Sequence, residues 1–263
     1  MADSWTYSKL TPLRAGRPHQ FLTELFIQLF LWSKKVTRKH EEFPVGFTEW
    51  ALAGHFAVAA SQPPLNCFSY QDYCVKLTDA HKREKKTQVM RPDLHLRREG
   101  WHNVCIFEFK RMFIPLKPSA RRDFAKSIPR LIKNAHDQLV RVSSGEWANL
   151  ICSAIGMTIW LDYMVKGRDR WIDKWEREKV YVEAWNNLLF QKIVPALKVN
   201  ADDLEKSGHI YYCGYRMPHT LVKTHHDWQE KEWSIRKDKD NQQVRTLPIG
   251  MVWILAVQEF PQP

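Results

Sequence analysis

The stretch "RPDLHLRREGWHNVCIFEFK", residues 91–110, determines how the rest of this chain is interpreted. Two runs with strand-like composition, 88–97 and 103–113, flank the polar segment "RREGWHN". Strand-forming runs on either side of a glycine-containing turn are typical of a β-hairpin, so we predict that the two runs pair. These runs nevertheless carry two acids and a lysine where a strand would be expected to bury apolar side chains.

The charged residues of this hairpin fall on one face. Side chains alternate between the two faces of a strand, so Glu108 and Lys110 share one face and Phe107 and Phe109 point to the other. If the arms pair, Asp93 lies beside Glu108, and two such carboxylates destabilise each other unless a cation lies between them. Mg²⁺ prefers oxygen ligands of this kind, and the Lys110 ammonium would then orient or deprotonate a water or hold a phosphate oxygen. The alternative is a surface hairpin whose charges simply alternate outwards.

The composition describes a chain with a core and a strongly basic character. Its 263 residues are enough for one sizeable domain with or without a small appendage, and a 44% hydrophobic content argues against wholesale disorder. Forty Lys and Arg residues against 29 Asp and Glu residues give a net charge of +11. Such a charge favours anionic partners, nucleic acid ahead of a membrane surface, although a basic but inert surface is the alternative. The chain has no phosphate-binding G-x-x-x-x-G-K-[ST] loop, so we do not expect it to hydrolyse ATP by itself.

Two further features bear on the compartment. The five cysteines are scattered and never form a C-x-x-C pair, which favours reduced, buried thiols in a cytoplasmic protein and gives no support to a zinc site. The apolar run 21–32 is shorter than the roughly 20 residues that a membrane span needs, and it contains Glu24. We therefore predict a packing helix there and a cytoplasmic protein that does not enter a membrane.

The order of the remaining elements predicts a mixed α/β fold, with a central sheet flanked by helices. Apolar residues at helical spacing, or polar segments of matching length, predict helices at 20–35, at 47–60, within 117–142 and at 168–198. Runs of β-branched and aromatic residues predict further strands at 67–77, 147–163, 209–217 and 251–260, with a charged loop before the last. Pro129 is expected to kink the third helix or to begin its second half.

The motif residues of the hairpin resemble those of a known superfamily. Pro92–Asp93, fourteen intervening residues and then Glu108–Phe109–Lys110 are similar to the signature of the PD-(D/E)XK nucleases. That superfamily includes many restriction endonucleases, RecB-type exonucleases, Holliday-junction resolvases and phage-defence effectors. The resemblance implies a restriction-endonuclease-like core with the element order α-β-β-β-α-β.

The resemblance covers about residues 45–163 and implies a division of the chain. Residues 1–45 would be an N-terminal helical extension, and residues 46–163 would form the nuclease-like core. Residues 164–263 would supply a C-terminal helix and strands that complete or extend this core. The segments outside the core would shape substrate choice, dimerisation or partner binding.

The resemblance also implies a metal site. Asp93 and Glu108 would hold one or two Mg²⁺ or Mn²⁺ ions, and the backbone carbonyl of Phe109 would supply a further ligand. A glutamate on the first core helix often completes such a site. Glu49 is the best match by its order in the chain, and Glu24 is the substitute.

Two further catalytic roles follow from the same resemblance. Lys110 would position the nucleophile and offset developing negative charge. The helix that follows carries Ala135, Gln138 and Leu139, similar to an A-x-x-Q-L pattern found in several branches of the superfamily. Gln138 would then lie near the scissile phosphate or the metal-bound waters.

Basic residues cluster around the first motif residue and form a candidate nucleic-acid contact. The residues are Lys82, Arg83, Lys85, Lys86, Arg91, Arg97 and Arg98. They would grip phosphates at the mouth of the site, with a contribution that weakens as salt rises. A solvated charged loop is the equally weighted alternative for the run before Asp93.

The sequence thus predicts a metal-dependent nuclease that hydrolyses phosphodiester bonds, with DNA favoured over RNA. The alternative from another class is a catalytically inactive nuclease-like module that binds nucleic acid or a protein partner in a larger complex. A third hypothesis is a basic structural subunit whose hairpin charges are surface decoration. For the nuclease, a homodimer or a partner ATPase or recognition subunit is the expected assembly.

Overall fold

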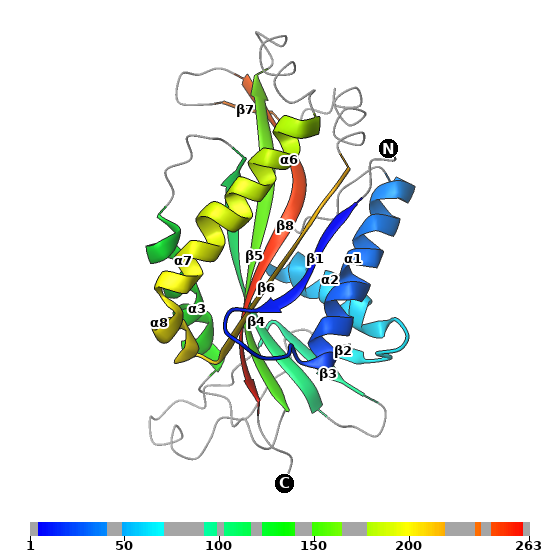
Figure 1. The fold of residues 1–263 in the computed structure, drawn as a ribbon. Coiled ribbons are helices and arrows are strands. Elements are labelled where there is room, and N and C mark those ends of the chain that lie inside the picture. Colours follow the sequence, from blue (N-terminus) through cyan, green and yellow to red (C-terminus); the bar gives the residue numbers. More distant parts are fainter. Residues whose placement is uncertain are drawn as a thin grey trace.

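The computed structural model describes most of the chain. The described residues are 5–40, 49–70, 92–98, 103–116, 123–139, 149–164, 178–218, 235–237 and 243–259. They form an α/β fold in which one mixed sheet is flanked by helices on both faces, which confirms the predicted fold class at this level (Figure 1). No helix within these ranges is both long enough and apolar enough to cross a membrane.

The sheet contains eight strands within the described ranges. They are β1 (Thr6–Pro12), β2 (Phe68–Tyr70), β3 (Leu94–Arg97), β4 (Asn103–Pro115), β5 (Leu150–Met164), β6 (His209–Arg216), β7 (Ile235–Lys237) and β8 (Gln243–Glu259). Seven of them follow the order β1-β6-β8-β5-β4-β3-β2, and β7 pairs with β8. β4 and β5 are parallel, whereas the other described pairs are antiparallel. The predicted pairing of the two hairpin arms is therefore confirmed by β3 and β4.

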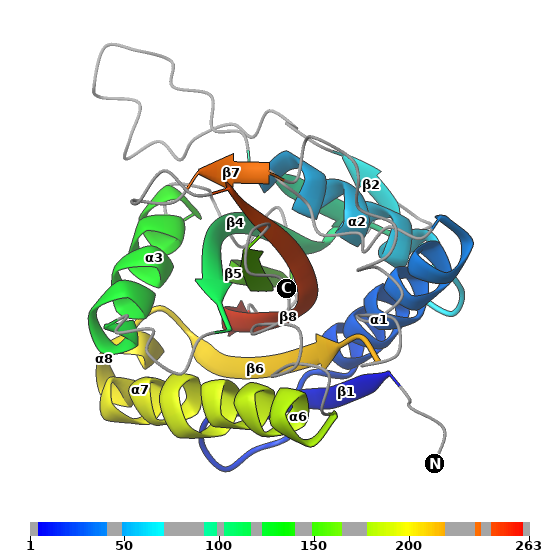
Figure 2. The ribbon, with the colours of Figure 1, turned by 90° about the horizontal axis from the view of Figure 1, so that it is seen from above.

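The helices form two layers around this sheet. They are α1 (Gln20–His40), α2 (Glu49–Ser61), α3 (Phe124–Leu139), α6 (Glu178–Asn186), η2 (Asn187–Ile193), α7 (Val194–Val199) and α8 (Ala201–Glu205). Figure 2 shows α1 and α2 on one side of the curved sheet, and α3 with the continuous α6–η2–α7 rod on the other. α3 passes through Pro129 as one helix, so this proline does not begin a separate second half.

The core between the sheet and α2 is aromatic. The ring of Phe56 in α2 lies 5.3 Å from that of Phe107, 4.9 Å from that of Phe109 and 4.9 Å from that of Trp253, measured between centroids. All four side chains are buried. The odd-numbered positions of β4 thus pack on α2, which leaves the even-numbered positions, including Glu108, on the opposite face.

Gly156 allows β5 to pack closely against the aromatic core, because it has no side chain. A Cβ atom added at this position would lie 2.9 Å from the Trp253 ring and 3.0 Å from the Leu52 side chain. Only a residue without a side chain fits there without moving these neighbours. The glycine therefore belongs to a continuous buried strand, as predicted for 147–163.

Two strands begin where the sequence did not predict them. β1 lies in the segment that was expected to be a helical extension, and it pairs with β6 at the edge of the sheet. β8 begins at Gln243 rather than at 251, because the sheet tolerates Pro248 at a register shift between Ile159↔Gly250 and Trp160↔Pro248. A bulge is one of the few places where a proline fits in a strand.

Two other predictions can be compared in part. The predicted helix at 168–198 is seen from Glu178 onward, and its first ten residues lie outside the described ranges. Four of the five cysteines are described, and all four are buried free thiols, as predicted: Cys67, Cys105, Cys152 and Cys213. The remaining cysteine, Cys74, lies outside the described residues.

Candidate active site

The candidate site lies beside β4 at the point where β3 begins. The two strands pair as Leu94↔Phe107 and His95↔Ile106, so the antiparallel register places Asp93, just before β3, opposite Glu108. The Asp93 Oδ2 atom accepts a 2.7 Å hydrogen bond from the backbone N–H of Phe109. This carboxylate therefore satisfies a β4 donor at the point where the ladder between the strands stops.

Lys110 contacts one carboxylate of its own strand, β4, and one of α2. Its Nζ atom donates a 2.8 Å hydrogen bond to Oε1 of Glu108 and lies 3.7 Å from Oε2 of Glu49. Glu49 is the first residue of α2, where the helix dipole favours a negative charge. We call Glu49, Asp93, Glu108 and Lys110 the carboxylate–lysine cluster.

The cluster is not a solvated surface feature. The side chain of Glu108 is only 7% exposed and that of Lys110 15%, whereas that of Glu49 is 41% exposed. Charged groups buried to this degree are rare unless they are paired. The hypothesis that the hairpin charges are surface decoration is therefore wrong for Glu108 and Lys110.

Burial and crowding perturb the protonation of the cluster. Burial raises the pKa of Glu108 to about 7; the Lys110 hydrogen bond opposes this rise, while the negative charges of Asp93 and Glu49 add to it. For Lys110, burial lowers the pKa, but the hydrogen bond to Glu108 and the surrounding negative charges outweigh it and leave the pKa raised. The ammonium therefore stays protonated, whereas the Glu108 carboxyl is poised near neutral pH.

Two neighbouring residues were not found from the sequence. Burial lowers the pKa of Arg111 to about 10, against the opposing charge of Glu49, and its guanidinium carbon lies 3.9 Å from the centroid of the Phe113 ring. Ser153 of β5 is the register partner of Glu108. Arg111 directly follows the motif lysine, so its side chain projects from the opposite face of the strand, and no sequence pattern indicates that it lies near Glu49.

The structure separates the two glutamates proposed for the first core helix. Glu49 lies in the cluster, whereas Glu24 lies in α1 and its Oε1 atom accepts a 2.7 Å hydrogen bond from Gln28. Gln138 is exposed on α3 and makes no hydrogen bond or ion pair to the cluster within the described part of the chain. Its catalytic role stays a prediction.

Two of the predicted nucleic-acid contacts, Arg97 and Arg98, lie within the described residues. The guanidinium carbon of Arg97 lies 5.4 Å from the centroid of the Tyr70 ring, and that of Arg98 lies 5.8 Å from the Phe21 ring. Arg98 is exposed and Arg97 partly so. The other predicted contacts lie outside the described residues: Lys82, Arg83, Lys85, Lys86 and Arg91.

The donor chemistry of the cluster suits a hard divalent cation, since three carboxylates and the Phe109 carbonyl are all oxygen ligands. Their present arrangement does not assemble a site. Glu108 accepts a hydrogen bond from Lys110 and Asp93 one from the N–H of Phe109. Accordingly, no three His, Cys, Asp or Glu side chains of the described ranges are grouped to hold a metal ion.

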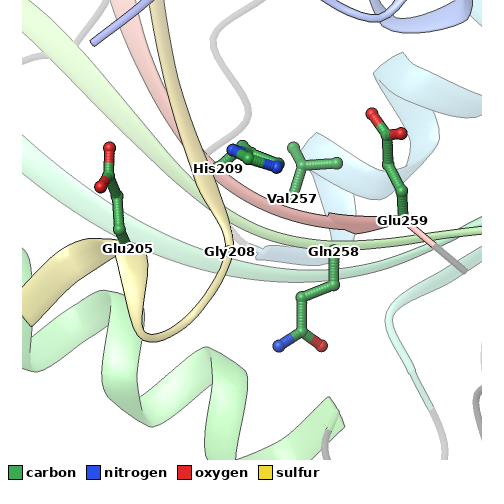
Figure 3. Close-up of a pocket in the computed structure, with 6 residues that line it drawn as sticks. All are labelled: Glu205, Gly208, His209, Val257, Gln258 and Glu259. Atoms are coloured by element: carbon green, nitrogen blue, oxygen red, sulfur yellow. The ribbon is translucent and has the colours of Figure 1, made fainter. Parts of the chain in front are cut away.

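A pocket elsewhere in the fold shares no residue with the cluster. Its volume is about 510 Å³, and its lining residues are Glu205, Gly208, His209, Val257, Gln258 and Glu259. Figure 3 shows Glu205 and Glu259 at its two ends with His209 and Val257 between them. The Glu205 carboxylate forms an ion pair with Arg14 at 2.9 Å, and this pair borders the pocket.

Comparison with known proteins finds no match. No protein-family model, no curated protein and no solved structure matches the chain.

Proposed function

We propose that this chain is a divalent-metal-dependent nuclease of the PD-(D/E)XK type, which hydrolyses phosphodiester bonds in nucleic acid, with DNA favoured over RNA. The observation that carries the proposal is the convergence of Glu49, Asp93 and Glu108 around the Lys110 ammonium. These residues come from α2, from the segment before β3 and from β4. A cluster assembled from separate elements and perturbed in its pKa values is typical of functional sites.

The order of the surrounding elements supports the same proposal. Among the described elements, α2 is followed by β2, β3, β4, α3 and β5. This is the α-β-β-β-α-β order that the resemblance implies for a restriction-endonuclease-like core. β6, β8 and β1 then extend the sheet beyond β5.

In the proposed site, Asp93, Glu108 and Glu49 would hold Mg²⁺ or Mn²⁺. The Phe109 carbonyl is suited to join them, because its N–H points to the Asp93 side, and the N–H and C=O of one strand residue point the same way. A bound divalent ion would polarise the phosphodiester and lower the pKa of a coordinated water. Lys110 would act as a cation that holds a phosphate oxygen and offsets developing negative charge, because its ammonium stays protonated.

The charge of the chain supports an anionic polymer as substrate. The net charge of +11 attracts phosphates at long range. The exposed Arg98 follows β3, at the opposite end of this strand from Asp93. Binding is expected to weaken steeply as salt rises. Nucleic acid that binds with no salt dependence would contradict this part of the proposal.

A cleavage assay tests the proposal. Supercoiled, linear and single-stranded DNA, together with RNA, would be incubated with Mg²⁺, Mn²⁺ or EDTA. We expect metal-dependent cleavage that Lys110→Ala reduces by about a hundredfold or more, because a cation that stabilises transition-state charge is lost. Lys126→Ala, which removes an exposed lysine from α3, is the matched control and should cleave normally. Normal cleavage by Lys110→Ala would show that the site assignment is wrong.

One observation favours a second candidate, an inactive nuclease-like module that binds nucleic acid or a protein partner. Glu108 and Asp93 already have partners within the protein, so the cluster is also consistent with a self-contained ion-pair network. The same assay separates the two candidates. Binding that survives EDTA, with no product under any metal, favours the inactive module.

The proposal extends to the setting of the enzyme. The four described cysteines are buried free thiols, which suits a reducing, cytoplasmic compartment. A nuclease of this kind would act as a homodimer or with an ATPase or recognition subunit, and phage defence is one role that the resemblance implies. Size measurement of the purified chain, alone and with DNA, distinguishes the homodimer from a monomer that needs a partner.

A further inference from the structure

Three polar residues lie in a row at the level of Glu108: Asp93 just before β3, Glu108 in β4 and Ser153 in β5. The register places Asp93 beside Glu108 on one side, and Glu108 is paired with Ser153 of β5 on the other. Directly paired residues of neighbouring strands project from the same face. The row becomes apolar at the next strands, where Ser153 pairs with Ala256 and Ala256 with Ile210.

Ser153 is the residue in this row that local packing does not explain. Its side chain is 1% exposed, and its hydroxyl makes no hydrogen bond within the described part of the chain. A buried hydroxyl without a partner destabilises the fold and calls for an explanation. If this position required only a small side chain, alanine would be sufficient, as it is at the adjacent positions 154 and 256.

Glu108 offers the missing acceptor. Only its Oε1 atom accepts a hydrogen bond among the described residues, and that bond comes from Lys110. The second oxygen, Oε2, and the Ser153 hydroxyl are thus unused groups on neighbouring strands, whose backbones lie about 4.8 Å apart. The direct pairing of the two residues places this acceptor and this donor on the same face of adjacent strands.

We propose that Ser153 is a positioning residue for Glu108, donating a hydrogen bond to its carboxylate when that carboxylate turns from Lys110 towards a metal ion. The inference rests on the proposed function, because it assigns Glu108 the role of a metal ligand. Hydrogen bonds to ligating carboxylates fix their orientation, and losing one typically weakens metal affinity about 10- to 100-fold. Among the described residues, Lys110 is the present hydrogen-bond donor to the Glu108 carboxylate, and a carboxylate that turns away from it needs another donor to fix its orientation.

Metal binding without nucleic acid provides the test. Free Mn²⁺ would be titrated by electron paramagnetic resonance against the full chain and its variants, and the binding that Glu108→Gln abolishes defines the site. We expect Ser153→Ala to weaken this binding about tenfold or more. In EDTA, the same variant should unfold at an equal or higher urea concentration, because an unsatisfied buried hydroxyl has been removed.

A matched pair of variants separates the hydroxyl from the shape of the side chain. Ser153→Thr keeps the hydroxyl and Ser153→Val replaces it with a methyl group in a side chain of the same shape. We expect Mn²⁺ binding to be retained in the threonine variant and weakened in the valine variant. Equal affinities in these two variants would overturn the proposal, even if Ser153→Ala were less stable than the natural protein.

The titration also distinguishes failure of this inference from failure of the proposed function. Unchanged Mn²⁺ affinity in Ser153→Ala, with binding lost in Glu108→Gln, refutes the role of Ser153 and leaves the metal-dependent nuclease standing. If the natural protein shows no Mn²⁺ binding that depends on Glu108, the nuclease proposal fails and the role of Ser153 fails with it.

Discussion

Replacing Glu108 by glutamine should change how the stability of the protein depends on pH. The pKa of this carboxyl rises from the ordinary value of 4.5 to about 7, because it is buried and lies near two other carboxylates. The folded protein therefore binds this proton more tightly than the unfolded chain does. Stability from the protonated group is fully present below pH 4.5 and is lost as the pH rises through about 7. A tenfold change in proton affinity corresponds to about 1.4 kcal/mol, so the free energy of unfolding should fall by about 3 kcal/mol across this window.

Urea denaturation between pH 4.5 and 8.5, followed by tryptophan fluorescence, measures this effect. The informative quantity is the free energy of unfolding of the natural protein minus that of Glu108→Gln at each pH. The contributions of the other titrating groups largely cancel in this difference. We expect it to fall by about 3 kcal/mol as the pH rises from 4.5 to 8.

The exposed carboxylate of Glu183 provides the control for this experiment. Glu183→Gln removes a carboxylate whose side chain is 64% exposed in α6, so it reports the effect of one lost surface charge. A difference for Glu108→Gln that stays level across the whole pH range would refute the reasoning. It would mean that the Glu108 carboxyl is not held in a buried site crowded by negative charge.

Two further substitutions test the local structure. Asp93→Ala should lower the free energy of unfolding by about 1–3 kcal/mol, because the N–H of Phe109 loses its acceptor, whereas Asp93→Asn keeps an acceptor and should recover most of that loss. Equal losses in urea denaturation of these two variants would contradict the bond's structural role. Gly156→Ala should cost about 1–3 kcal/mol, because its Cβ would lie 2.9 Å from the Trp253 ring. Gly214→Ala, whose Cβ would meet its neighbours at 3.4 Å or more, is the control, and equal stability of the two variants would sink the packing argument.

The hairpin could be predicted because its signals are local. Alternation within 103–113 separated Glu108 from Phe107, and the short polar segment before it predicted that the preceding run would pair with it. The same locality explains the helices at 20–35 and 47–60, where apolar residues repeat at helical spacing and end at basic or proline-rich segments. Within one element or between adjacent ones, the chain carries enough pattern to set the face of each side chain.

The features that the sequence did not reveal depend on distant pairings. β1 pairs with β6, about 200 residues further along the chain, and the short run "TYSKLTP" has no apolar alternation that marks it as a strand. Ser153 is a neighbour of Glu108 because of the parallel register of β4 and β5, which no residue pattern specifies. Glu49 was chosen by its order in the chain, but its contact with Lys110 depends on how the first residue of α2 packs beside β4.

Glu108 is the member of the cluster that best separates function from structure. Asp93 has a structural task in accepting the N–H of Phe109, and Lys110 compensates for a buried charge. Glu108 adds a third carboxylate to a buried site that already lies near the carboxylates of Asp93 and Glu49. An apolar side chain at this position, such as that of the buried neighbour Ile106, would avoid the electrostatic repulsion. Apolar replacement of buried ion pairs is often neutral or stabilising, so stability alone does not account for this residue. Loss of cleavage in Glu108→Gln, without loss of stability above pH 7, is the combination expected of a functional carboxylate. A purely structural ion pair would instead lose stability when the carboxylate is removed.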